Sequence, residues 1–272
     1  MTSLAMLARV RRGRAAARVD WLPPLLVFVG VLVLWEASFL LLQVQSFLIP
    51  RPSEIWASLI SEGPTLLRGV AYTGVEALGG LVLGVGLGTL AGLATARWAT
   101  ARKTLVPLGN AMSTIPIIAF APITLNWFGL ESQLPRITIV ALMTFFPVLV
   151  NTVRGLTNVD PAALELMTSY GASEIAVLRR LRIPNALPYW FTALKIAVTL
   201  SVIGAVVGEF FGGPAYALGI YVTNQTGAFR YPNAWAAIVV ACLLGIGMYL
   251  AASALEAVLI PWQRRREAVS AE

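Results

Sequence analysis

The sequence predicts an all-α polytopic membrane protein with six transmembrane helices. Of its 272 residues, 58% are hydrophobic and only 12% are charged, whereas soluble domains average about 25% charged residues. The mean hydropathy of +0.77 agrees with this class. Six apolar stretches are each long enough to cross the hydrocarbon core of a bilayer. They run over residues 21–42, 69–96, 104–128, 136–153, 189–211 and 234–259.

The chain divides into a basic segment (1–20), one six-helix membrane domain (21–262) and a short tail (263–272). The basic segment is not a signal peptide, because the apolar stretch after it is too long and no small-residue cleavage site closes it. Residues 47–68 contain three prolines and a short amphipathic piece, and we expect them at the outer surface.

Glycines and prolines indicate how the second and third spans pack. Four glycines at intervals of four residues line one stripe of the second span, so that another helix can approach its backbone closely. They are Gly80, Gly84, Gly88 and Gly92. The third span holds Pro107, Pro116 and Pro122. Prolines at membrane depth are tolerated where protein surrounds the backbone, so this span is predicted to be central and bent.

Residues 160–188 are predicted to form two short helices around a glycine. Asp160 can cap the first helix, and Pro161 suits its first turn, where no N–H partner is needed. Gly171 falls where a helix ends in a left-handed residue. Ser173 can cap the second helix.

Two prolines at the end of this segment are expected to interrupt the helix before the fifth span. They are Pro184 and Pro188, so that the fifth span is predicted to begin at residue 189. Residues 215–233 are semi-polar and are predicted to form an outer loop with a short, partly buried helix.

The basic residues are distributed unequally between the two predicted sides of the membrane. One side carries sixteen Lys and Arg residues: five before the first span, three in the first loop, five from 154 to 195, and three in the tail. The other side carries four. Since cytoplasmic segments are enriched in Lys and Arg, both termini and residues 160–188 are predicted to be cytoplasmic. The net charge of +7 is therefore interpreted as topology, and nucleic acid is not an expected partner.

The 160–188 segment resembles the signature loop of permease subunits of type I, binding-protein-dependent ABC importers. The family pattern is Glu-Ala-Ala, three residues, Gly, nine residues and Ile-x-Leu-Pro. Here it stands as Glu165-Leu166-Met167, Gly171 and Leu181-Arg182-Ile183-Pro184. Leucine and methionine replace the two alanines. The resemblance implies that the contact with a cytoplasmic ATPase is made by Glu165, Leu166, Met167, Tyr170, Gly171, Ala172, Ser173 and Pro184.

Further motifs are similar to the subgroup that handles nitrate, sulfonates, taurine and vitamin precursors. They are Ile115-Pro116 through Trp127-Phe128-Gly129, Phe145-Phe146-Pro147 with Asn151-Thr152, and Val207-Gly208-Glu209-Phe210. The resemblance covers about residues 69–259. It implies a multi-pass protein of the bacterial inner membrane, paired with a second permease copy, two ATPase subunits and an extracytoplasmic solute-binding protein.

The chain itself is not expected to be an enzyme or to bind a cofactor. It contains no G-x-x-x-x-G-K-[ST] phosphate loop, so ATP and Mg are expected to be used by the partner ATPase. It has no histidine, and its single cysteine, Cys242, lies in an apolar stretch. An ion-coupled secondary transporter stays as the alternative, although we find no internal repeats with matching broken helices.

Four polar or aromatic residues at membrane depth are candidates for the translocation pathway: Thr114, Asn126, Phe145 and Glu209. Intramembrane charges are functional candidates by default. Glu209 either gates or contacts solute, or is an interfacial carboxylate or a partner of Arg136 or Arg230. Glu36 and Glu76 are expected to face other helices or the interface. The solute is either a pyrimidine- or flavin-like vitamin precursor or a sulfonate-, taurine- or nitrate-type anion. The absence of a concentrated basic patch in the spans favours the uncharged aromatic class.

The six-span topology predicts that Ser173 and Gln133 lie on opposite sides of the membrane. Single cysteines at these two positions, in a Cys242→Ser background, should therefore react with an impermeant maleimide from opposite faces of oriented vesicles. Labelling of both from the same face would contradict the topology.

Overall fold

The computed structural model describes residues 22–42, 49–112 and 114–261, and every regular element in these ranges is helical. The predicted basic segment 1–20 and the tail 263–272 lie outside the described residues. The elements are α2 (Leu22–Leu42), α3 (Pro52–Ser61), α4 (Gly63–Arg97), α5 (Ala99–Met112), the 3₁₀ helix η1 (Ile117–Phe120), α6 (Ala121–Phe128), α7 (Leu134–Thr157), α8 (Pro161–Ser169), α9 (Glu174–Val177), the π-helical segment η2 (Leu178–Arg182), α10 (Ile183–Glu209), α11 (Leu218–Gly227) and α12 (Tyr231–Leu259).

The described residues confirm the six-span, all-α prediction. Five helical stretches are individually long and apolar enough to cross a membrane. The sixth span is a bent pair, Lys103–Met112 and Ile117–Phe128, whose halves lie at 84° to each other. The predicted bend of the third span is thus present, and Pro116 occupies the position just before η1.

The second span begins earlier than predicted. Helix α4 begins at Gly63 rather than at residue 69 and is 35 residues long. The reason is Pro64, which lies in the first turn of the helix, where its missing N–H would have no intrahelical partner. At 1.5 Å per residue, α4 is about 52 Å long and extends beyond the hydrocarbon core.

The core of the bundle is the close contact between α4 and α7, as predicted from the glycine stripe. A Cβ atom on Gly88 would lie 2.7 Å from the carbonyl oxygen of Phe145, and one on Gly92 would lie 2.6 Å from Cγ2 of Thr152. Backbone therefore packs directly against the neighbouring helix. Helix α10 packs on the other side of α7, where Gly155 has no room for a Cβ against Ala186.

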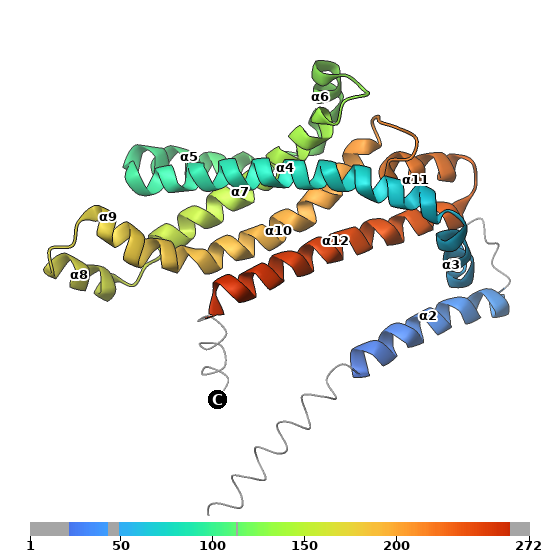
Figure 1. Cartoon of the computed structure of the whole chain (residues 1–272), viewed down its shortest axis with the longest axis horizontal. Coiled ribbons are helices and arrows are strands. Elements are labelled where there is room, and N and C mark those ends of the chain that lie inside the picture. Colours follow the sequence, from blue (N-terminus) through green and yellow to red (C-terminus); the bar gives the residue numbers. More distant parts are fainter. Residues whose placement is uncertain (1–21, 43–48, 113, 262–272) are drawn as a thin grey trace, which may run out of the picture.

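The axes of the long helices α4, α7, α10 and α12 lie roughly parallel to one another, as Figure 1 shows, and the chain direction of α10 is opposite to that of the other three. The hairpin of α8 and α9 lies at one end of them, and the short helices α3 and α11 lie at the other. Helix α12 is joined to α10 by an ion pair between Lys195 Nζ and Glu256 Oε2 at 2.8 Å. Near α3, the backbone N–H and hydroxyl of Ser53 donate to Glu36 of α2.

The glycine contact predicts opposite effects for two neighbouring substitutions. Gly88→Ala forces a methyl group into the α7 backbone and should destabilise the fold by about 1–3 kcal/mol, the usual cost of overpacking. Gly86 is exposed, with nothing within 4 Å of its Cβ position. Gly86→Ala should therefore be neutral or stabilising, because alanine favours a helix over glycine by about 1 kcal/mol. Thermal unfolding in detergent compares the two. Equal melting temperatures would contradict the close contact.

Candidate functional site

The hairpin of α8 and α9 projects from the end of the bundle (Figure 1), and α8 has no buried residue. The predicted N-cap is present, since Asp160 Oδ1 accepts the N–H of Ala162 at 3.0 Å. Ser173 caps the second helix by accepting the N–H of Ala176 at 3.3 Å. Each cap satisfies an N–H group at the start of its short helix that has no partner within the helix.

Large apolar side chains on the hairpin are exposed. Tyr170 is 82% exposed, Ile175 65% and Leu166 58%. Beside them, Glu165 and Ser173 are also exposed, whereas Met167 and Ala172 are half-buried. Adjoining apolar side chains outside the core typically mark a site where another protein binds.

The turn between the two helices has a defined hydrogen-bonding pattern around Gly171, whose φ is +68°. Its N–H donates to the carbonyl of Thr168 at 2.9 Å, and the N–H of Ala172 donates to the carbonyl of Met167 at 3.0 Å. This is the Schellman arrangement that ends a helix on a left-handed residue. The prediction of a left-handed glycine is confirmed.

The second helix does not stop where the prolines were expected to interrupt it, and that prediction was wrong. Helix α9 continues through the π-helical segment η2 into α10, which makes one apolar stretch of 36 residues from Glu174 to Glu209. Pro184 lies in the first turn of α10 and is half-buried, and Pro188 lies inside it. Locally wider π geometry allows a helix to accommodate a proline without a break.

Two asparagines form hydrogen bonds between the base of the hairpin and α7. Neither was predicted from the sequence. Asn185 Nδ2 donates to the carbonyl oxygens of Gly155 at 2.8 Å and Asn158 at 2.9 Å. Asn158 Nδ2 donates to the hydroxyl of Tyr189 at 2.8 Å. The partners are about thirty residues apart, and no local pattern pairs them. These bonds join α7 and α10 at the point where the hairpin leaves the bundle.

Three predicted pathway residues lie near the broken third span but are not gathered into one cluster. Thr114 and Asn126 are exposed, and Phe145 is half-buried against Phe146, with 5.0 Å between ring centroids. A hollow of about 280 Å³ lies at the break in this span, and none of the three residues is among those that line it. Among the described residues it is lined by uncharged side chains and backbone: Ile115, Pro116, Ile117, Ile118, Met143, Phe146, Pro147 and Leu200.

Glu209 lies away from this hollow and is completely buried. Its Oε1 accepts the hydroxyl of Thr73 at 2.7 Å, and its Oε2 accepts the backbone N–H of Gly219 at 2.6 Å. Arg136, also completely buried, pairs instead with Glu76 at 2.6 Å between Nε and Oε1. Glu209 is therefore engaged by α4 and α11 in this structure.

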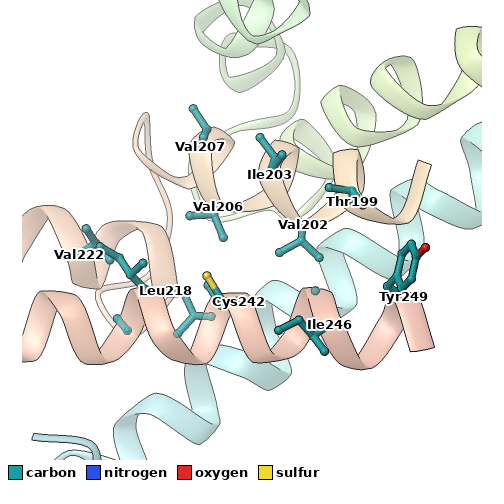
Figure 2. A pocket seen from close by; sticks show the side chains of 14 residues that line it. Thr199, Val202, Ile203, Val206, Val207, Leu218, Val222, Cys242, Ile246 and Tyr249 are labelled. Carbon is teal, nitrogen blue, oxygen red and sulfur yellow. The ribbon is translucent and has the colours of Figure 1, made fainter. Parts of the chain in front are cut away.

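A larger apolar groove of about 550 Å³ lies between α10 and α12. Figure 2 shows Val202 and Val206 of α10 facing Cys242 and Ile246 of α12 across it. Its described lining contains no charged side chain, and its polar side chains are limited to Thr199, Cys242 and Tyr249.

A bundle of membrane-crossing helices with one sharply broken span and a projecting hairpin is the architecture of a transport permease. The model of the family described as the binding-protein-dependent transport system inner membrane component matches residues 84–265. The chain belongs to this family.

Several permeases are similar to this protein over nearly its full length, and their names give different solutes. A formylaminopyrimidine transport permease protein from Halalkalibacterium halodurans is 36% identical over 247 residues, covering 90% of this chain and 97% of the relative. A riboflavin transport system permease protein from Chloroflexus aurantiacus is 30% identical, covering 93% and 95%. A putative aliphatic sulfonates transport permease protein from Bacillus subtilis is 24% identical, covering 95% and 94%.

A solved structure shares the fold. A chain from the crystal structure titled as an amino acid ABC transporter with histidines superposes with a TM-score of 0.58 at 18% identity, covering 77% of this chain and 97% of that one. The chain is thus a multi-pass inner-membrane permease of an ABC importer, with the type I permease fold. The ion-coupled alternative is not supported by this family membership.

The hairpin turn predicts a difference between two substitutions of the same glycine. A valine at 171 is strained by about 1–2 kcal/mol in the left-handed region, whereas asparagine tolerates that conformation. No neighbouring atom lies within 4 Å of the Cβ position, so the effect is conformational. Gly171→Val should strongly impair ATPase co-purification and transport at matched membrane abundance, Gly171→Asn should be close to the parent, and Glu165→Ala should be intermediate. Parental transport by Gly171→Val would make the hairpin a passive connector.

Proposed function

We propose that this permease moves a small uncharged heteroaromatic solute inward, driven by a cytoplasmic ATPase that binds the α8–α9 hairpin. The observation that carries the proposal is the hairpin itself. It places Leu166, Tyr170 and Ile175 in an exposed position outside the bundle, on a rigid capped turn. Exposed apolar side chains on a preformed turn suit a groove on another protein.

The proposed complex contains two copies of this chain and two ATPase subunits, with both termini and the hairpin in the cytoplasm. ATP and Mg are bound and hydrolysed by the ATPase, and this chain binds no cofactor. An extracytoplasmic solute-binding protein delivers the solute at the opposite end, near α3 and α11. The proposed ATPase contact comprises the eight residues of the signature loop: Glu165, Leu166, Met167, Tyr170, Gly171, Ala172, Ser173 and Pro184.

The solute class is inferred from the lining at the broken span. The hollow beside η1 presents Ile117, Met143 and Phe146, and no described charged side chain lines it. A sulfonate or nitrate would lose its hydration there without a cation to pair with, at a cost of several kcal/mol. A flat uncharged ring can instead stack on aromatic side chains. The relatives named for formylaminopyrimidine and riboflavin agree with this choice, and Thr114, Asn126 and Phe145 are proposed to line the route beside the hollow.

The proposal predicts ATP-dependent uptake of a labelled aminopyrimidine into vesicles that contain the complete importer. Excess taurine should not compete, because no described charged side chain lines the hollow beside η1. Leu166→Asp should abolish ATPase co-purification and uptake, since a charge is placed in the apolar contact. Thr223→Asp carries the same new charge at an exposed position of α11, at the other end of the bundle, and should keep the ATPase bound. Competition by taurine would reassign the solute class, and retention of the ATPase by Leu166→Asp would refute the docking surface.

A further inference from the structure

A network of buried polar groups connects four helices at the end of the bundle opposite the hairpin. Thr73 and Glu76 of α4, Arg136 of α7 and Glu209 of α10 each have an exposed fraction of 0%. Burial of three ionisable groups is costly unless each is bonded. A function that depends on their placement would account for the cost.

Helix α11 begins at this network without a cap of its own. The N-cap residue is Ala217, which has no side-chain oxygen, and the first N–H groups of a helix lack intrahelical partners. The N–H of Leu218 donates to Thr73 Oγ1 at 3.2 Å, and the N–H of Gly219 donates to Glu209 Oε2 at 2.6 Å. Glu209 and Thr73 thus perform from α10 and α4 the role that a serine or aspartate at 217 would perform locally.

The carboxylate suits this position for two reasons. A negative charge at a helix N-terminus interacts favourably with the partial positive charge there. The approach is also close, since a Cβ atom on Gly219 would overlap the backbone carbonyl oxygen of Val206 and would lie 2.8 Å from Cβ and 3.0 Å from Oε2 of Glu209. Only glycine at 219 leaves room for the contact as it stands.

Arg136 holds the turn that leads into α11. Its Nη1 donates to the carbonyl of Gly212 at 3.0 Å, while its Nη2 donates to Tyr72 and to the carbonyl of Ser132. Its Nε is occupied by Glu76. The segment between α10 and α11 is therefore fixed at its turn by Arg136 and at the helix start by Glu209.

We infer that Glu209 is a positioning residue that caps α11 from α10, and thereby fixes the surface of the permease that receives the solute-loaded binding protein. The inference rests on the proposed function for the identity of that partner, and on the contacts above for the role of Glu209. Solute contact by Glu209 is the competing assignment, and it makes different predictions.

A labelling experiment tests the cap without any partner protein. Val222→Cys on half-buried α11, in a Cys242→Ser background, reports release of the helix through its rate of reaction with an impermeant maleimide. Glu209→Ala and Gly219→Ala should each raise the rate about fivefold, the population change expected when an N-cap is lost. Glu209→Gln keeps an acceptor oxygen for Gly219 and should stay within about twofold of the parent. Thr73→Val should lie between. The control, Glu131→Gln, removes an exposed charge outside the network and should change nothing.

A second measurement links the cap to delivery. In the assembled importer, Glu209→Ala and Gly219→Ala should raise the concentration of solute-loaded binding protein that half-stimulates ATP hydrolysis, while Glu209→Gln should restore it. The inference is overturned if Glu209→Ala labels at the parental rate, or if Glu209→Gln loses transport as completely as Glu209→Ala, which would indicate solute contact. If Glu209→Ala does not insert into the membrane, the labelling rates of Thr73→Val and Glu209→Gln are compared instead. The inference then requires Thr73→Val to label faster than Glu209→Gln. Absence of any stimulation of the parent by its binding protein would refute the proposed function and leave the labelling result intact.

Discussion

The close packing of α4 on α7 is the contact on which the other positions in this permease depend. Because the glycines of α4 bring the two backbones together, α7 is held along nearly its whole length. Helix α10 then packs on α7, and α12 is joined to α10 through Lys195 and Glu256. The hairpin at one end and the buried charges at the other are both extensions of these helices, so their geometry follows from the central contact.

The two ends of the bundle differ in the side chains that they expose and bury. At the hairpin end, apolar side chains such as Tyr170 are exposed, while each short helix is capped at its start and hydrogen bonds close the turn between them. At the other end, Arg136, Glu76 and Glu209 are buried inside protein. Arg136 pairs with Glu76, Glu209 accepts from Thr73 and Gly219, and the network orders the segment that follows α10.

Local signals in the sequence were sufficient for the spans and for the hairpin. Apolar length, the caps at Asp160 and Ser173, and the glycine at 171 act within a few residues, so they can be recognised without knowing the fold. The continuation of the helix past Pro184 could not, because it depends on a π-helical turn that precedes the proline.

Long-range contacts and helix orientation account for most of what the sequence did not reveal. Arg136 and Glu76 are sixty residues apart, and the asparagine bonds at the hairpin base join segments about thirty residues apart. For Glu209, sequence placed a charge at the end of a span, but the rotation of α10 decides whether that side chain meets solute or another helix. Periodicity in one chain does not fix that rotation when several faces of a helix are apolar.

The uninterrupted helix from Glu174 to Glu209 has a mechanical consequence. Thirty-six residues at 1.5 Å each make a rod of about 54 Å, with the hairpin turn at its beginning and the cap of α11 at its end. Helices bend most readily at π-helical segments and prolines, and both lie near the hairpin end of this helix. The helix beyond them can therefore carry a displacement from one end to the other. Since coupling between two sites is reciprocal, a protein bound near α11 would alter the affinity of the hairpin for its own partner by the same factor as the converse. If the proposed partners bind at these two ends, delivery of solute near α11 and nucleotide binding by the ATPase at the hairpin would be coupled through this one helix.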